Sequence, residues 1–390
     1  IRSGRLDTDE FAVGMELEGY VVDDARRLAR VPEAVFDRAD CGKELGVHNF
    51  EVNSAATTFD AAGIADQADR IRANVDAAVA ALDDVGLAPV LDAMWTIPPT
   101  EGTDAYLGAV EEHEGVVVAE NMRHHPRYVA LDNEILERSG GTITLDVPGA
   151  SLAYPTILME SLATSIQPHL QIPDTDAFPR YFNLAVRTMG PVLSLTSNAP
   201  FLPADCYGDD PAVIDATPHE LRIPVFEGSI NADAPRGEGK VRFPEDLERA
   251  TDVVDRVVAD ETYAPVLADG DADPDASPYR STLREYDHKR GVHWRWVRGV
   301  VGGQPVGTEP DGASLRIEYR PLPTQPTVRD TVATQVLVVG LLRGLGVADH
   351  PLTELPWAAA RDCFYDVVDD GPDADLAWVT ADGDRTADPE

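Results

Sequence analysis

Four short segments of the sequence alternate polar and apolar residues, and this period of two constrains the fold most strongly. The segments lie at residues 11–21, 48–53, 165–172 and 315–320. Neighbouring side chains of an extended chain point to opposite faces, so each segment predicts a strand with one apolar and one polar face. The polar positions carry mainly Glu, Asn, Gln, His and Arg, and no Lys. That composition is typical of a surface that binds cations and handles phosphate.

The polar positions of these strands are the candidate functional residues. They are Glu16 and Glu18 in the first segment, Glu51 in the second, His169 and Gln171 in the third, and Arg316, Glu318 and Arg320 in the fourth. Tyr20, Asn49, Asn53 and Gln167 occupy other polar positions of the same segments. Because the segments are spread along the chain, a shared face must assemble from most of the sequence. We therefore expect a single domain over residues 1–350, with these side chains on one concave surface and Arg320 at its edge.

Helical periodicity between the strands predicts three helices that would cover the apolar side of the sheet. Their start and stop signals are Asp60 and Gly86 for the first helix, Asp176 and Gly190-Pro191 for the second, and Thr327 with Asp330, then Gly344 and Gly346, for the third. Residues 228–245 and 268–279 are rich in Gly, Pro, Asp and Ala and are predicted to be loops. Residues 351–390 are predicted to be an acidic segment that docks on the domain and then frays.

The chain is strongly acidic. It has 69 Asp and Glu against 32 Lys and Arg, a net charge of −37, and only three of the bases are lysines. Because the acids are spread along the whole chain, we interpret them as a salt-adapted, halophilic surface that needs high ionic strength. No basic stripe is present, which argues against nucleic-acid binding.

The cysteines and the hydropathy pattern indicate a cytoplasmic protein. The three cysteines, Cys41, Cys206 and Cys363, are odd in number and outside any CxxC pattern, which predicts a reducing compartment. No apolar run of 18 residues and no signal-peptide pattern occurs, so we expect neither a membrane span nor secretion. The start at Ile1 leaves room for a preceding segment.

Common catalytic motifs are absent from the sequence. It contains no GxxxxGK[ST], no GxGxxG after a predicted strand, no GxSxG and no HExxH. Any nucleotide would therefore be held by metals, arginines and loops. Asp269, Asp271 and Asp273 are spaced like the start of a calcium loop, but Pro274 and Arg280 occupy positions that need Gly and Glu, so a solvated acidic loop is favoured.

Five motifs occur in the order found in a known family. Residues 15–20 (MELEGY), 44–53 (ELGVHNFEVN), 165–171 (SIQPHLQ), 191–201 (PVLSLTSNAPF) and 316–321 (RIEYRP) resemble the motifs of the glutamate–cysteine ligase type 2 carboxylate-amine ligases. The resemblance implies an α+β fold similar to glutamine synthetase and guanido kinases, with a curved antiparallel sheet forming a funnel and helices on the outer face. It also implies an ATP-dependent ligase that forms an amide, such as a γ-glutamyl bond, through an acyl phosphate.

The resemblance implies roles for individual residues. The expected ligands of two or three Mg²⁺ or Mn²⁺ ions are Glu16, Glu18, Glu51, His169 and Glu318. Glu18, Gln171 and Arg316 are expected to contact ATP, and Arg320, with Arg222 as a weaker match, to assist phosphoryl transfer. The roles of Glu44, His124 and His125 are left open. The expected partners are small molecules, namely ATP, a carboxylate and an amine, with neither nucleic acid nor membrane, and a homo-oligomer is compatible with the sequence.

Two alternatives stay open at this point. A metal-dependent amide hydrolase would use the same Glu and His residues without a nucleotide and would leave Arg320 without a task. A catalytically silent binding homologue would be expected to lack one of the key residues, and none is missing. Pro168 and Gln171 around His169 depart from the usual family pattern, so the resemblance does not fix the substrates. Trp294 and Trp296 are interpreted as core residues rather than a stacking platform.

Overall fold

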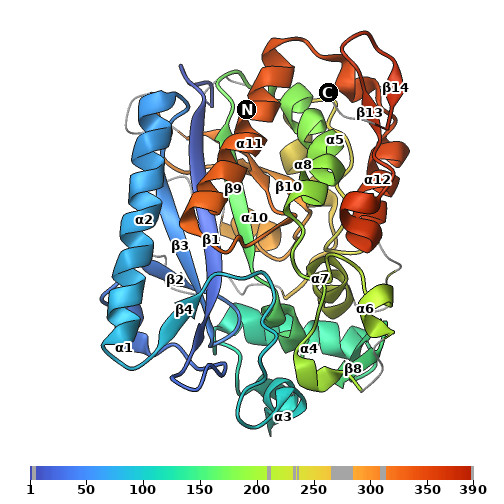
Figure 1. The fold of residues 1–390 in the computed structure, drawn as a ribbon. Coiled ribbons are helices and arrows are strands. Elements are labelled where there is room, and N and C mark those ends of the chain that lie inside the picture. Colours follow the sequence, from blue (N-terminus) through green and yellow to red (C-terminus); the bar gives the residue numbers. More distant parts are fainter. Residues whose placement is uncertain are drawn as a thin grey trace.

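The computed structural model describes residues 1, 6–208, 212–231, 234, 237–264, 284–307 and 313–387. Within these residues, one large sheet forms the centre of the molecule, and its strands do not follow one another in chain order (Figure 1). Its strands are β1 (Ala12–Val22), β2 (Cys41–Lys43), β3 (Asn49–Thr58), β4 (Ala88–Val90), β9 (Ser165–Gln171), β10 (Val297–Val301), β11 (Leu315–Tyr319) and β12 (Leu322–Pro323). They run in the order β10, β11, β9, β1, β3, β2, with β12 beside β9 and β4 beside β1. Every strand pair in it is antiparallel, as predicted.

Three helices cover the apolar face of the sheet. In Figure 1, α2 (Ala61–Asp83), α5 (Phe178–Thr196) and α11 (Val328–Val347) lie in front of the strands. They bury the alternating apolar residues of the strands, such as Leu17, Val52, Ile166 and Ile317, at no more than 1% exposure. This burial is the main favourable term for assembling the layers.

The remaining elements extend the domain around this centre. The helices are α1 (Glu33–Phe36), α3 (Thr103–Gly108), α4 (Pro126–Arg138), α6 (Val213–Ala216), α7 (Arg222–Ile230), α8 (Asp252–Ala259), α10 (Arg284–Arg290) and α12 (Trp357–Asp370), with 3₁₀ turns η1 (Ile157–Leu162), η2 (Ala204–Cys206), η3 (Pro351–Glu354) and η4 (Gly371–Asp373). Three hairpins pair β5 (Val110–His113) with β6 (Val116–Ala119), β7 (Ile143–Val147) with β8 (Ala150–Tyr154), and β13 (Trp378–Val379) with β14 (Arg385–Thr386).

Two of the predicted helix starts are confirmed. The Asp60 carboxylate accepts hydrogen bonds from the backbone N–H groups of Ala62 and Gly63 at 2.9 and 2.8 Å. The Thr327 hydroxyl accepts one from the backbone N–H of Asp330 at 3.1 Å. Both side chains satisfy amide groups that have no partner within the helix. Gly344 and Gly346 do not stop the third helix but lie within its last turn, since α11 continues to Val347.

The predicted limits of the second helix are wrong at both ends. Its N-cap is Ala177 rather than Asp176, and Gly190-Pro191 lies inside the helix, which continues to Thr196. Val192 and Leu193, after the proline, are buried at 2% and 0% exposure. The packing of these residues outweighs the cost of one proline in the helix.

The structure describes only part of the two predicted loops and of the C-terminal segment. Residues 228–230 belong to α7, and the other described residues of the first predicted loop belong to no helix or strand. The second predicted loop, residues 268–279 with Asp269, Asp271 and Asp273, lies outside the described residues. After residue 350, α12 packs against α5 and the hydrophobic core continues to Val379.

Helix α11 is long and apolar enough to span a membrane by length and composition alone. Its Gln335 side chain, however, donates a hydrogen bond to the Gly14 carbonyl of β1 at 2.8 Å, as in a helix packed on a sheet.

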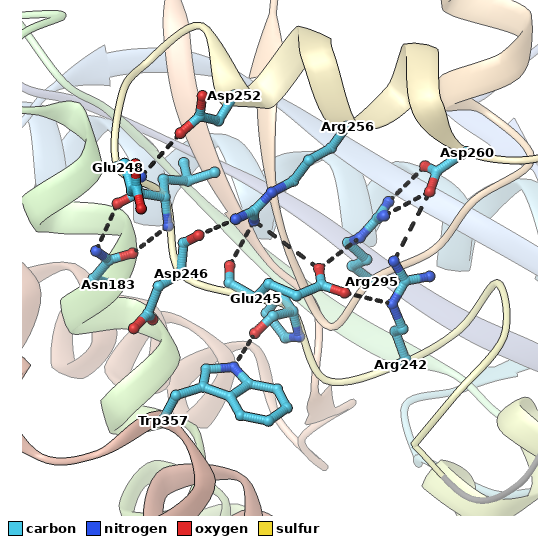
Figure 2. Close-up of polar contacts among 12 residues, drawn as sticks. Asn183, Arg242, Glu245, Asp246, Glu248, Asp252, Arg256, Asp260, Arg295 and Trp357 are labelled. Atoms are coloured by element: carbon cyan, nitrogen blue, oxygen red, sulfur yellow. Dashed lines mark hydrogen bonds and ion pairs between the residues drawn. The ribbon is translucent and has the colours of Figure 1, made fainter.

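A polar network fixes the chain segment before β10. Figure 2 shows the Glu245 side chain next to Arg242, Arg256 and Arg295, and Asp260 next to Arg242 and Arg295. Arg295 forms two hydrogen bonds with the Asp260 carboxylate at 2.8 and 2.7 Å. These charge-assisted bonds hold the start of β10, and with it the residues around Arg295, in one position.

Candidate active site

The strand register places the predicted polar residues on one sheet face. The directly opposed pairs are Glu18 and Glu51, Glu16 and Gln167, and Glu318 and His169. Directly opposed residues in antiparallel strands point to the same side, and residues two apart on one strand do so too. The five predicted metal ligands therefore share one face, as the alternation in the sequence predicts. The structure divides the acidic residues at this face into two groups, and it adds Glu44 to the first.

Three carboxylates that form no ion pair with a basic side chain among the described residues make up the first group. Oxygens of Glu18, Glu44 and Glu51 lie within 4.8 Å of one another. Burial raises the pKa of Glu44 to about 8, with a further contribution from the charge of Glu18, and burial together with the charge of Glu44 raises the pKa of Glu51 well above its usual value. Like charges held this close favour the protonated forms unless a cation is bound. Hard oxygen ligands of this kind suit Mg²⁺ or Mn²⁺.

Glu18 is held in place on two sides. Its carboxylate accepts hydrogen bonds from the backbone N–H of Ser165 and the side-chain amide of Gln167, both at 2.7 Å. The carboxyl group of Glu160 lies near it, and burial followed by the charge of Glu18 raises the pKa of Glu160 to about 8. The acidic group is therefore fixed by the backbone and ready to accept a positive charge.

Glu318 belongs to the second group and is neutralised by arginines. Its Oε1 accepts hydrogen bonds from Arg298 at 2.7 Å and Arg320 at 2.6 Å. Burial alone would raise the pKa of Glu318, but Arg298, Arg320 and His169 hold it well below its usual value. Arg320 also donates to the Gln167 side-chain carbonyl. A guanidinium fixed beside a carboxylate in this way can face an anion in the open pocket.

His169 connects Glu16 to an arginine. Its Nε2 lies 3.1 Å from Glu16 Oε1, and its Nδ1 accepts a hydrogen bond from Arg316 Nε at 3.0 Å. Burial would raise the pKa of Glu16, yet the neighbouring His169 outweighs this and the pKa is lowered. The Arg316 bond requires an unprotonated Nδ1, so any proton on this imidazole is carried on Nε2, toward Glu16.

Two pockets meet at this row of side chains. The larger has a volume of about 650 Å³ and is lined by the three-carboxylate group, Glu160, Arg222, Arg298 and Arg320. The smaller, of about 510 Å³, is lined by His169, Gln171, Arg316 and residues 303–306. Glu16 lines both pockets. The sheet face thus presents acidic and basic groups to two adjoining spaces.

Several predicted residues have structural partners in addition to their place at a pocket. The Gln171 amide donates to the Glu10 and Val306 carbonyls at 3.0 and 3.1 Å, which ties the N-terminal segment to residues 303–306. Arg222 is 2% exposed and bonds Glu220 and the Pro321 carbonyl. His124 and His125 line neither pocket, and His125 caps α4 instead.

The structure adds two residues that the sequence does not single out. Glu160 lies in a 3₁₀ turn, where no strand alternation marks it. Arg298 is directly opposite Glu318 in the sheet, but it is the only polar residue of β10 (VRGVV), so no period-two alternation marks it. Trp296 is buried at 2% exposure, as predicted, whereas Trp294 is half-buried, and both rings border the larger pocket.

These observations define a protein built on an antiparallel sheet. One face of that sheet carries a group of carboxylates that can bind a cation, next to arginines that hydrogen bonds hold in place. The chain belongs to glutamate-cysteine ligase family 2, and the sequence model of that family matches residues 12–367. A search of curated proteins gives no match. The fold is similar to that of a glutamate–cysteine ligase from Francisella tularensis in complex with AMP, with a TM-score of 0.52, 12% identity, and coverage of 97% of this chain and 76% of that one.

A second solved structure, a bifunctional glutathione synthetase from Pasteurella multocida, aligns with a TM-score of 0.48 and 13% identity. The alignment covers 90% of this chain and 42% of that chain.

The strand pairing and the helices of this structure confirm the predicted large antiparallel sheet with outer helices. The specific funnel of glutamine synthetase and guanido kinases stays a prediction.

Proposed function

We propose that the protein is an ATP-dependent carboxylate-amine ligase that works through an acyl phosphate. The family supports a ligase. The single observation that carries the mechanism is that Glu18, Glu44 and Glu51 and the arginine Arg320 face one pocket. Transfer of a phosphoryl group to a carboxylate needs cations and a guanidinium around the same spreading negative charge.

The residues divide the work in the proposed reaction. Glu18, Glu44 and Glu51 would hold one divalent cation. A second cation at Glu16, His169 and Glu318 is what the family resemblance implies, and Glu318 would have to share its carboxylate with Arg298 and Arg320 there. These ions would neutralise the phosphate oxygens of the nucleotide. Arg320, fixed by Glu318 and Gln167, stabilises the charge on the transferring group, and Arg298 holds Glu318 from the other side. Arg316 faces the smaller pocket, which we assign to the nucleotide.

The reaction is tested by trapping the intermediate with hydroxylamine in place of the amine. With ATP, Mg²⁺ or Mn²⁺, molar KCl and a series of carboxylates beginning with glutamate, we expect a hydroxamate and an equal amount of ADP. Release of an amine from amides without ATP would instead favour the hydrolase. Nucleotide binding with neither reaction would favour a silent homologue.

Arg320→Ala should lower the rate of hydroxamate formation by about 10³-fold or more, because a guanidinium acting on the developing charge contributes most in the transition state. Nucleotide binding, measured by calorimetry, should change far less. Arg72→Ala is the matched control, since Arg72 is 55% exposed and pairs with Asp69 on the outer helix α2. Near-normal turnover of Arg320→Ala would contradict the assigned role.

A further inference from the structure

The larger pocket has different chemistry at its two sides. Its three-carboxylate group lies over β1, β2 and β3, whereas Trp294, Trp296 and Arg298 come from the segment that forms β10. In the sheet, β11 and β9 separate β10 from β1. The pocket therefore extends from an acidic side to an aromatic and basic side, about three strand spacings away.

Three rings form the wall on the β10 side. Phe226 contacts Trp294 with ring centroids 5.7 Å apart at 70°, and contacts Trp296 at the same separation. The Trp296 indole donates to Glu227 at 2.8 Å, and Arg295, between the two tryptophans, is fixed by the network of Figure 2. Such rings offer a large apolar surface that loses little entropy when a ligand binds.

Two basic side chains already lie over these rings. Lys240 Nζ is 4.6 Å from the centroid of Trp294, and the Arg222 guanidinium carbon is 5.9 Å from that of Trp296. Lys240 is buried at 2% exposure and does not line the pocket, so it contacts the ring from within the protein. A ring that faces one cation attracts a second one weakly, and the two like charges repel. The wall therefore suits an uncharged side chain and disfavours a cationic one.

Two arginines beside the wall have unused donors. Arg127 and Arg290 both line the pocket, and the buried Nε of each has no hydrogen-bond partner. A Cβ at Gly291 would lie 3.1 Å from an Arg127 terminal nitrogen, so Arg127 packs against the residue that follows Arg290. Within the described part of the chain, Arg127 has no carboxylate partner, and Arg290 reaches Asp287 only at 3.4 Å. This pair of guanidinium groups suits a carboxylate ligand.

We infer that the β10 side of the larger pocket binds the amine substrate, a free α-amino acid with an apolar or aromatic side chain. Its side chain packs on Phe226 and Trp294, which the buried Trp296 supports, and its α-carboxylate contacts Arg127 and Arg290. The inference rests on the proposed ligase function and adds the class of amine. The amine nitrogen forms a C–N bond to the acyl phosphate carbon while the C–O bond to phosphate breaks. Phosphate leaves with the electron pair, and the amine protons pass to phosphate and solvent.

The first test compares amino acids with hydroxylamine, which needs no side-chain pocket. We expect kcat/KM for L-phenylalanine and L-leucine to exceed that for glycine, L-aspartate and L-lysine by at least tenfold. Hydroxamate formation without this preference, or with L-cysteine preferred over both apolar amino acids, would overturn the inference and leave the ligase function standing. Absence of hydroxamate, with L-phenylalanine still bound in calorimetry, would overturn the ligase chemistry and support the amino-acid site.

Variants locate the binding to the named residues. Trp294→Ala should weaken L-phenylalanine binding by about tenfold, as expected for loss of one aromatic contact. Trp357→Ala is the matched control, because Trp357 lies outside both pockets and bonds the Pro244 carbonyl. Arg127→Gln should weaken L-phenylalanine binding but not that of 2-phenylethylamine, which lacks the carboxylate. Equal effects on both ligands would show that Arg127 does not contact the carboxylate, and unchanged binding in Trp294→Ala would exclude the aromatic wall.

Discussion

Glutamates that share one sheet face have opposite electrostatic surroundings. Glu318 lies between Arg298 and Arg320 at hydrogen-bond distance, whereas Glu51 faces Glu18 and Glu44. Removing a charge therefore has opposite consequences at the two positions. In the first case two partly buried arginines lose their shared anion, and in the second a repulsion between carboxylates is relieved.

Glu318→Gln should lower the free energy of unfolding by about 3 kcal/mol in the metal-free protein, because it leaves Arg298 and Arg320 without their anion. Urea unfolding in molar KCl measures the difference. Glu51→Gln is the matched variant, with the same change of group on the same face, and it should leave the metal-free protein as stable or more stable. Equal destabilisation by both substitutions would contradict the division into two groups.

The acidic group also predicts a pH dependence. Glu44 and Glu160 have usual pKa values of 4.5 that burial raises to about 8. Between these values the unfolded chain releases protons that the folded protein keeps, so the free energy of unfolding should fall as pH rises from about 4.5 to 8, by at most about 1.4 kcal/mol per pH unit for each group.

Urea unfolding in molar KCl and EDTA measures this slope, and Glu44→Gln should reduce it. Addition of Mg²⁺ should restore stability at the alkaline end, because a bound cation favours the ionised carboxylates. A slope that is the same in wild type and Glu44→Gln would show that Glu44 does not keep its proton in the folded protein.

Strand alternation was sufficient to predict which glutamates share a face, since the period of two needs no knowledge of neighbouring strands. It could not predict which of them are neutralised. Glu318 meets Arg298 because β10 pairs with β11, and the order of strands in a sheet is not encoded in the periodicity of any one strand. Glu160 could not be found either, because it lies in a 3₁₀ turn.

At the scale of elements, the helix starts depend on single side chains. Asp60→Ala removes the acceptor for two backbone N–H groups of α2 and should lower the free energy of unfolding by about 1 kcal/mol. Asp176→Ala is the control, because α5 begins with Ala177 as its cap and Asp176 has no capping bond to it. Equal losses for the two variants, measured by urea unfolding, would contradict this difference.

The helix starts were predictable because capping is a local bond between residues two or three apart. The end of α5 was not, because Gly190 is needed for contact between elements rather than for a turn. A Cβ at Gly190 would lie 2.7 Å from the Cys363 sulfur and 3.2 Å from its backbone. The glycine lets α12 pack closely on α5, and a local pattern does not distinguish this use from a helix stop.

At the scale of the molecule, 37 excess negative charges must be screened. We expect the melting temperature to rise steeply between low and molar KCl, well beyond the effect on a protein of balanced charge. Thermal unfolding followed by circular dichroism over a KCl series measures the dependence, with sucrose as a control for nonionic effects. A flat profile would show that the acids are compensated locally.

The shared position of Glu16 between two pockets has a consequence for product inhibition during turnover. Each pocket is lined mostly by its own set of residues. If the smaller pocket holds the nucleotide, as proposed, ADP should compete with ATP, whereas the amide product should compete with the amino acids. Product-inhibition kinetics would separate these two patterns.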